Sequence, residues 1–248
     1  MAGATQEWFR VKAHEIDAFS RISISSLLFA MQEVAWNNAE ELGASIYQLQ
    51  ARNISWVLSR LKLELYQRPQ HRDRYQVETY PAGQQRSLVY RDYVIRGEDL
   101  QTRAAAYSTW IVFDMEARKM ISIPADLQPL VQLPPGKEAL ERQHARLRMP
   151  ADQALQSARV LQIRRADLDP NQHVSNQAYL TWIMEALPDA LYQQGKLRSI
   201  DLHFKAECDF QKEVIVKNYQ LEANRWLHQI WLGEEKELVR AETQWEQG

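Results

Sequence analysis

Residues 164–187 read RRADLDPNQHVSNQAYLTWIMEAL, in which a polar loop leads directly into an apolar stretch. The loop places Asp169, Asn171 and His173 at alternate positions. Apolar residues then recur at the spacing of a helix: Tyr179, Leu180, Ile183, Met184 and Leu187. Such a loop can cap the helix, and it can also bring an acid, an amide and an imidazole to one side for chemistry.

The same unit occurs once more, 152 residues earlier in the chain. At this offset Ser23 falls on Ser175, and apolar residues fall on apolar residues. Asp17 falls on Asp169, but the positions that match Asn171 and His173 carry Phe19 and Arg21. The offset predicts an internal duplication in which only the second copy keeps the chemical groups.

Each copy is expected to contain a short strand, a polar loop, a long helix and then a series of antiparallel strands. The helices are predicted at 25–43 and 175–195, with Gly43 and Gly195 as C-caps and a kink at Pro188. The strands after them are predicted at 54–66, 74–82, 87–97, 102–115, 198–210, 214–223, 225–233 and 237–246. This order predicts an α+β fold in which the sheet wraps the helix.

The predicted domains are residues 1–131 and 158–248. Residues 132–157, which include QLPPGKEALERQHARLRMPADQ, are rich in proline and charge and poor in apolar residues. They are expected to form a linker with one short helix.

Composition excludes several classes of function. The chain has 248 residues, is 45% hydrophobic and carries a net charge of −2, which argues against a general nucleic-acid binder. One cysteine excludes a disulfide framework, and no glycine-rich phosphate loop is present. No apolar run approaches the length of a membrane span. We therefore expect a cytoplasmic protein that binds neither nucleic acid nor a membrane.

Stretches of both copies resemble the acyl-acyl carrier protein thioesterases, a family of plant plastid enzymes and bacterial relatives. They are NISWVLSRLKLEL, VYRDYVIRG and TRAAAYSTWIVFDMEARKMISIP in the first copy, and RRADLDPNQHVSNQAYLTWIMEALP and LHFKAEC in the second. The resemblance covers nearly the whole chain. It implies a tandem double hotdog, in which residues 1–131 bind the acyl chain and residues 158–248 carry catalysis. It also implies hydrolysis of the thioester of fatty acyl-acyl carrier protein, which releases free fatty acid in fatty acid biosynthesis.

The resemblance also implies a catalytic set, which falls on Asp169, Asn171, His173 and Glu207. Cys208 occupies the position of a cysteine once regarded as the nucleophile of the family. In an extended strand, Glu207 and Cys208 would point to opposite sides, and Cys208 belongs to the apolar set. An apolar surrounding opposes a thiolate, so we expect Glu207 to serve the chemistry and Cys208 to pack in the core.

The expected chemistry is attack by water. His173 can take a proton from water if a carboxylate stabilises its cation. No metal or cofactor is expected. The resemblance places the acyl chain beside the helix of the first copy, and the candidate lining residues are Met31, Val34, Ala35 and Trp56. Arg164 and Arg165 flank the loop and could attract an acidic carrier protein that bears the acyl-phosphopantetheine.

Three other functions remain open at this point. An acyl-CoA thioesterase would share the chemistry and differ in the carrier. A non-catalytic sensor of acyl thioesters would not require the Asp169, Asn171 and His173 set, and a hotdog dehydratase would not explain the NQHVSN match. Three properties also stay open at this point: the length of the preferred acyl chain, the carrier, and the oligomeric state, for which a homodimer is one option.

Overall fold

The computed structural model describes residues 3–169, 172–210 and 212–247. The chain folds into two compact units, Met1–Gln143 and His144–Gly248. None of the helices within the described ranges is long and apolar enough to cross a membrane.

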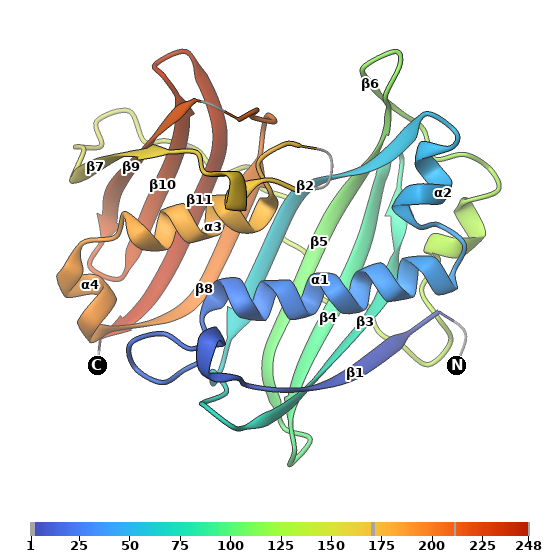
Figure 1. Ribbon diagram of the computed structural model, residues 1–248, viewed down its shortest axis with the longest axis horizontal. Coiled ribbons are helices and arrows are strands. Elements are labelled where there is room, and N and C mark those ends of the chain that lie inside the picture. Colours follow the sequence, from blue (N-terminus) through green and yellow to red (C-terminus); the bar gives the residue numbers. More distant parts are fainter. Residues whose placement is uncertain (1–2, 170–171, 211, 248) are drawn as a thin grey trace. The chain divides into compact units, whose positions relative to one another are not determined.

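The first unit packs a long helix, α1 (Ile24–Glu41), against an antiparallel sheet (Figure 1). Its strands lie in the order β1, β3, β4, β5, β2, and a short strand β6 pairs with β5. The strand bounds are β1 (Thr5–Arg10), β2 (Ile54–Leu65), β3 (Arg74–Gln85), β4 (Leu88–Gly97), β5 (Thr102–Asp114) and β6 (Lys119–Ile121). A short helix, α2 (Ile46–Gln50), follows α1, and the 3-10 turns are η1 (Ala13–Glu15) and η2 (Gln128–Val131).

Helix α1 begins and ends as its sequence predicts. The side chain of Ser23 accepts a hydrogen bond from the backbone N–H of Ser26 and caps the helix. After the last turn, Gly43 has a φ of +76°, a left-handed conformation that glycine adopts without steric cost, so the predicted C-cap is confirmed. The residues buried against the sheet lie at helical spacing: Ile24, Leu27, Leu28, Ala30, Met31, Val34 and Asn38.

The second unit repeats this plan with a shorter helix, α3 (Asn176–Glu185). Its antiparallel strands lie in the order β8, β11, β10, β9, β7. Their bounds are β7 (Ser157–Gln162), β8 (Gly195–Phe204), β9 (Glu213–Glu222), β10 (Arg225–Leu232) and β11 (Lys236–Gln247). A 3-10 turn, η3 (Arg165–Asp167), precedes α3, and α4 (Asp189–Gln194) follows it. The predicted α+β fold, with one long helix and one antiparallel sheet in each copy, is confirmed.

Two details of the second helix differ from the prediction. Pro188 does not kink one helix but separates two, because α3 ends at Glu185 and Pro188 is the N-cap of α4. Proline has no N–H and its ring clashes with the preceding turn, so a complete stop is a normal outcome. Gly195 is not a left-handed C-cap, since its φ is −82° and it begins β8. A Cβ at Gly195 would lie 2.6 Å from the carbonyl oxygen of Leu191 and 2.8 Å from the ring of Trp245, so close packing explains this glycine.

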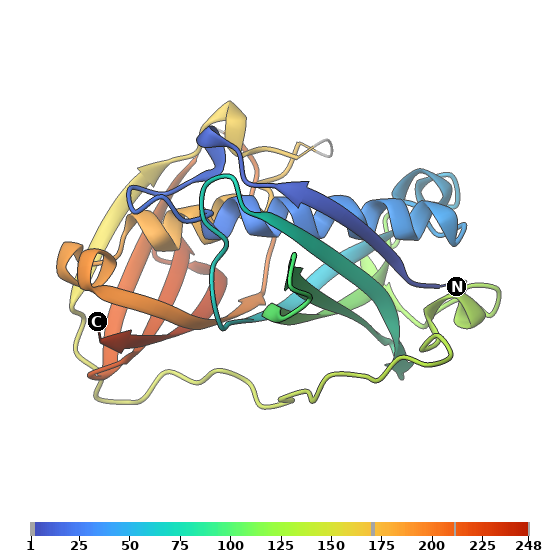
Figure 2. The same ribbon diagram turned by 90° about the horizontal axis from the view of Figure 1, so that it is seen from below.

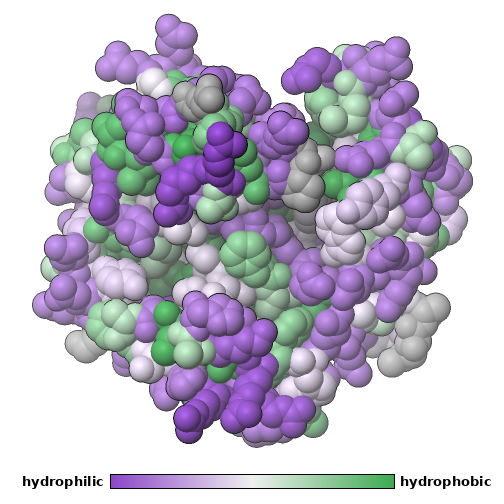
Figure 3. All heavy atoms as spheres, viewed as in Figure 1, coloured by the Kyte–Doolittle hydropathy of each residue, from purple (hydrophilic) through white to green (hydrophobic). Residues whose placement is uncertain are grey.

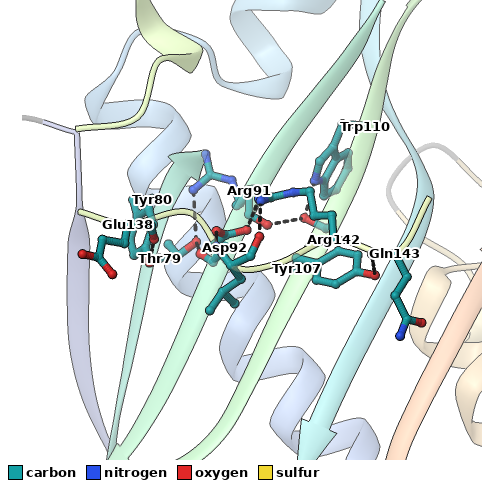
Figure 4. A network of polar contacts seen from close by, with 11 residues as sticks. Thr79, Tyr80, Arg91, Asp92, Tyr107, Trp110, Glu138, Arg142 and Gln143 are labelled. Carbon is teal, nitrogen blue, oxygen red and sulfur yellow. Dashed lines mark hydrogen bonds and ion pairs between the residues drawn. The ribbon is translucent and has the colours of Figure 1, made fainter. Parts of the chain in front are cut away.

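The predicted linker contains no helix, since all of residues 132–156 are described and none is helical or in a strand. Residues 137–143, which we call the strap, cross the face of the first sheet opposite to α1 (Figure 2). Side chains of the sheet accept hydrogen bonds from backbone N–H groups of the strap, which in a helix would bond to the helix's own carbonyl groups. The backbone N–H of Leu140 donates to Asp92 Oδ2 at 2.8 Å. The backbone N–H of Gln143 donates to the Tyr107 hydroxyl at 3.0 Å (Figure 4).

Asp92 is the buried centre of the strap contacts, with an exposed fraction of zero. Its carboxylate pairs with Arg142, whose guanidinium lies 4.9 Å from the ring centre of Tyr90 and 5.6 Å from that of Tyr107. Burial raises the pKa of Asp92 to about 6, against the opposing effects of the Leu140 N–H and the Arg142 charge. At neutral pH the ion pair therefore fastens the strap to the sheet.

The second unit buries a histidine that takes no part in the loop. His228, on β10, is fully buried between Asn218 Oδ1 and Thr243 Oγ1, each 2.8 Å from a ring nitrogen. Asn218 also donates to the carbonyl oxygen of Ala186 at the end of α3, so this network connects the helix to the sheet. Burial lowers the pKa of His228 to about 3, because the imidazolium would lose its hydration.

This burial predicts a loss of stability in acid. The unfolded histidine binds a proton near pH 6.5 and the folded one only near 3, so stability falls as the pH drops between these values. Between pH 7 and 5 the loss from this group is about 2 kcal/mol. Denaturant unfolding of wild type and His228→Gln at the two pH values measures it. The variant is expected to lose about 2 kcal/mol less than wild type, and an equal loss in both proteins would contradict the assignment.

Candidate active site

The loop before α3 is a tight turn closed by an aspartate. The backbone N–H of Asp169 donates to the carbonyl oxygen of His173 at 2.8 Å, and Asp169 Oδ1 accepts from the backbone N–H of His173 at 3.2 Å. Gln172 adopts a left-handed φ of 64° inside the turn. Asn171, a predicted site residue, lies outside the described residues, as does Pro170.

Helix α3 starts directly after this turn. Ser175 is its N-cap and accepts a hydrogen bond from the backbone N–H of Ala178 at 3.3 Å. The backbone N–H of Val174 donates to the carbonyl oxygen of Cys208 at 2.9 Å, which holds the turn against the chain segment that follows β8. The helix N-terminus beside His173 carries a partial positive charge that can stabilise a developing oxyanion.

Two carboxylates flank the imidazole of His173. Glu207 Oε2 lies 3.7 Å from Nδ1, and Asp209 Oδ1 lies 3.7 Å from Nε2. Both distances exceed a hydrogen bond, so each carboxylate lies beside the ring without bonding to it. The side chains of His173, Glu207 and Asp209 are 32%, 50% and 66% exposed, so water reaches the group.

Asp209 did not emerge from the sequence analysis, although Glu207 did. A signal was present, because residues two apart in an extended segment share a side, and the segment 207–209 reads Glu-Cys-Asp. The backbones of His173 and Asp209 form an isolated bridge, which is what brings the second carboxylate to the ring.

Cys208 is a buried core residue. Strand β8 ends at Phe204, so the expected strand does not reach this position. The two neighbours nevertheless separate, since Cys208 is 1% exposed while Glu207 faces solvent. Burial raises the pKa of the Cys208 thiol, which disfavours the thiolate that a nucleophile needs.

Tyr179 is a second residue that the sequence analysis did not single out for chemistry. It is buried on α3, where its ring packs against Trp182 and Phe204. Within the described ranges its hydroxyl has no hydrogen-bond partner. Burial, and then the nearby Cys208 and Glu207, raise its pKa, so the phenol stays protonated beneath the loop. In the sequence Tyr179 fits the apolar helical spacing, which gave no sign that its hydroxyl lies near the turn.

The first copy folds the equivalent turn with the same hydrogen bonds. The backbone N–H of Asp17 donates to the carbonyl oxygen of Arg21 at 2.8 Å, and Asp17 Oδ1 accepts from the backbone N–H of Arg21 at 3.1 Å. Ser20, which matches Gln172, has the same left-handed φ, 60°. The isolated bridges Ile16↔Ile22 and Leu168↔Val174 also match at the offset of 152 residues. The predicted duplication is therefore present in the hydrogen bonds as well as in the residues.

The side chains of the first turn form a different site. Asp17 Oδ2 lies 3.2 Å from Arg21 Nη2 and 3.0 Å from Arg68 Nη2, so two cations share this carboxylate. Arg21 also stacks on Phe19, 4.7 Å from the ring centre. An arginine keeps its proton at all accessible pH values and cannot act as a base there.

The remaining predicted residues lie as follows. Met31 and Val34 are fully buried on α1, and Ala35 is half-buried. Trp56 is half-buried, packs on the apolar cluster around Ala44, and donates from Nε1 to the carbonyl oxygen of Ala44 at 3.1 Å. These four residues belong to the first unit, and whether they contact an acyl chain stays a prediction.

Arg164 and Arg165, which precede the turn at Asp169–His173, already have partners. Arg164 pairs with Asp167 at 2.9 Å, which raises the pKa of the arginine. Arg165 lies over the ring of Phe210, 5.1 Å from its centre. Their role toward a carrier protein also stays a prediction. Among the described residues no group of three or more His, Cys, Asp or Glu is arranged to hold a metal ion.

Two family models match the chain and cover most of it. The acyl-ACP thioesterase N-terminal domain matches residues 3–130, and the acyl-ACP thioesterase C-terminal domain matches residues 151–247. Each model falls on one copy of the duplication.

Two of the curated relatives are proteins of one plant. The chain is 25% identical over 227 residues to oleoyl-acyl carrier protein thioesterase 1, chloroplastic, of Arabidopsis thaliana, a match that covers 85% of this chain and 62% of the relative. It is 28% identical over 213 residues to the palmitoyl-acyl carrier protein thioesterase, chloroplastic, of the same plant, covering 81% of this chain and 51% of the relative. The chain thus spans about three fifths or less of the length of these relatives.

Solved structures share the fold across the whole chain. The 12:0-ACP thioesterase from Umbellularia californica has a TM-score of 0.89 at 20% identity, covering 99% of this chain and 98% of that one. An acyl-ACP thioesterase from Bacteroides thetaiotaomicron has a TM-score of 0.83 at 22% identity and covers 98% of both chains. These likenesses confirm the predicted tandem hotdog fold.

Because the two turns share this hydrogen bond, we expect its removal to speed hydrogen exchange of the bonded amide in each turn. Asp169→Ala removes the acceptor of the His173 amide, and Asp17→Ala removes that of the Arg21 amide. Loss of a charge-assisted hydrogen bond of about 1.5 kcal/mol speeds amide exchange roughly tenfold. Hydrogen exchange followed by mass spectrometry measures each loop separately. Each variant serves as the control for the other, and an unchanged His173 amide in Asp169→Ala would contradict the anchoring role.

Proposed function

Because the chain belongs to the acyl-ACP thioesterase family, we propose that it hydrolyses the thioester of fatty acyl-acyl carrier protein and releases free fatty acid for fatty acid biosynthesis. The observation that carries this proposal is the imidazole of His173 between two carboxylates at the start of α3. Such a group can activate water without a covalent enzyme intermediate.

In the proposed reaction His173 takes a proton from a water molecule as its oxygen attacks the thioester carbonyl carbon. Glu207 and Asp209 stabilise the imidazolium that forms. The oxyanion gains stabilisation from the N-terminus of α3 and, by family resemblance, from Asn171. Collapse of the intermediate breaks the carbon–sulfur bond, and the departing thiolate takes the proton from the imidazolium, which regenerates the base.

Asp169 has a positioning role in this scheme. Its carboxylate bonds the backbone N–H of His173, and Asp17 makes the same bond in a copy that lacks a base. Because the bond exists without chemistry in the first copy, it orients the loop rather than carrying a proton.

The acyl chain is proposed to lie beside α1, lined by Met31, Val34, Ala35 and Trp56. Support comes from the burial of Met31 and Val34, since an acyl chain needs a dry channel. The partner is proposed to be an acyl carrier protein with an acyl-phosphopantetheine group, and Arg164 and Arg165 remain candidate contacts. A cytoplasmic location stays part of the proposal, whereas the plant relatives are described as chloroplastic.

An acyl-CoA thioesterase is the alternative enzyme. It would use the same residues, so the carrier must be decided by experiment. A panel of acyl-carrier-protein and acyl-CoA esters of equal chain length, assayed for kcat/KM, distinguishes the two. Absence of hydrolysis of either ester would favour the sensor instead.

The first functional prediction concerns the base. His173→Ala should lower kcat by roughly 10²–10⁴-fold, because general base catalysis is worth about that much. The side chain is one-third exposed, so the fold should survive, which circular dichroism can check. Hydrolysis at the wild-type rate by the folded variant would refute the role of His173.

The second functional prediction concerns the carboxylates. Glu207→Gln and Asp209→Asn each remove one charge beside His173, so the imidazolium that forms during the reaction loses a stabilising partner. Each variant should therefore lower kcat, on the order of tenfold, which corresponds to about 1.4 kcal/mol of barrier. The double variant should lower kcat further.

Cys208→Ser is the matched control for these variants. The thiol is buried and distinct from the charged pair, so kcat should stay near that of wild type and only stability should decrease. Full activity in the double variant Glu207→Gln/Asp209→Asn, or a trapped acyl-enzyme on Cys208, would contradict the scheme.

A further inference from the structure

One end of the first unit brings two separate segments together. The backbone N–H of Val11 donates to the carbonyl oxygen of Asp73 at 2.9 Å, and that of His71 donates to the carbonyl oxygen of Ser20 at 3.0 Å. The backbone N–H of Ile22 donates to the carbonyl oxygen of Pro69 at 2.8 Å. Residues 8–22 and 68–74 therefore form one connected surface, which we call the basic end.

The basic end has the opposite charge to the chain as a whole. It contains six Lys or Arg residues and three Asp or Glu residues, a net charge of +3, whereas the chain carries −2. In Figure 3 strongly hydrophilic side chains gather at the lower edge of this unit, where Figure 1 shows the loop that joins β2 and β3.

The carboxylates of the basic end are already occupied. Asp17 is shared by Arg21 and Arg68. Glu15 accepts from the backbone N–H of Lys12 at 2.7 Å, and Asp73 accepts from the backbone N–H of Gln70 at 2.9 Å. Arg74 pairs with Glu98, which lies outside the basic end, at 3.5 Å.

Three exposed cations remain without an ion pair to any described residue: Arg10, Lys12 and Arg72. Arg10 Nε donates to the carbonyl oxygen of Arg72 at 3.4 Å, a contact that leaves both charges unpaired. Fixed, exposed cations of this kind attract an anionic partner over roughly a Debye length.

Exposed aromatic side chains accompany these cations. Trp8 is 42% exposed with Arg74 5.4 Å from its ring centre, and Phe19 is 40% exposed beneath Arg21. Aromatic residues and arginine are enriched at protein–protein interfaces. The combination therefore fits a folded protein partner better than a purely ionic ligand.

We propose that the basic end is the docking surface for the acidic face of the acyl carrier protein, an inference that rests on the proposed function. The carrier binds through its own surface and presents the thioester on its flexible phosphopantetheine arm. Arg164 and Arg165 flank the catalytic turn but already contact Asp167 and Phe210. The unpaired cations of the basic end are freer to meet a second protein.

The test compares thioesters with and without the carrier. The variant Lys12→Gln/Arg72→Gln removes two exposed charges that make no ion pair with described residues. KM for acyl-acyl carrier protein should rise about five- to tenfold, with kcat nearly unchanged, because surface charges act mainly on encounter. KM for the acyl-N-acetylcysteamine ester, which lacks the carrier, should change less than twofold.

Arg118→Gln/Lys119→Gln is the matched control, since both residues are exposed in the same unit, at the turn between β5 and β6. It should leave both KM values unchanged. The KM of wild type for the carrier substrate should also rise with salt, and more steeply than that of Lys12→Gln/Arg72→Gln. An equal KM change for both substrates, or no change for either, would overturn the docking surface.

Direct binding separates this inference from the proposed activity. Titration calorimetry with holo-acyl carrier protein should give a five- to tenfold weaker Kd for Lys12→Gln/Arg72→Gln than for the control pair, on the order expected for rim charges. If wild type hydrolyses neither ester but the binding difference holds, the activity fails and the surface stands. Binding to anionic lipid vesicles that the variant loses, with an unchanged Kd for the carrier, would assign the surface to a membrane and refute the proposal.

Discussion

An aspartate carboxylate that bonds the backbone N–H four residues later sets the entry to both long helices. Asp17 and Asp169 make this bond at 3.1 and 3.2 Å, and in each turn the main chain then closes back on the aspartate. Because the anchor uses only backbone partners, the side chains at the other loop positions are free to differ. The turn could therefore keep its shape while His173 and Arg21 came to occupy equivalent places. The hydrogen bond of the aspartate fixes the shape of each turn, and the side chains around the turn determine its chemistry.

The need to pair backbone polar groups also explains the position of the strap. An extended segment of charged residues leaves its backbone groups without partners unless another element supplies them. The sheet supplies them through Asp92, Tyr80 and Tyr107, and Arg142 fills the space between two aromatic rings. A buried carboxylate in this position requires its cation, so removing Arg142 should cost about 3–5 kcal/mol. The strap thus belongs to the first unit and is not a loose tether.

Local pattern predicted much of this fold. The offset that aligns Asp17 with Asp169, the helical spacing after each loop and the alternation of the strands each depend on neighbours in sequence. They identified both helices, most strands and the polar turn that precedes each helix. Pro188 was read as a kink, since the sequence shows that a helix is interrupted but not whether it resumes.

Contacts between distant segments could not be read in this way. The approach of Asp209 to His173 depends on a bridge across 36 residues, and the strap depends on a side chain of β4. The same limit explains the basic end, where segments far apart in the chain meet and their charges add.

The two copies share the backbone conformation of the turn but differ in the charges around it. In the second copy two carboxylates flank an imidazole, whereas in the first two cations share one carboxylate. The cations left for recognition of an acidic partner are Arg10, Lys12 and Arg72, which lie beside the first turn rather than in it.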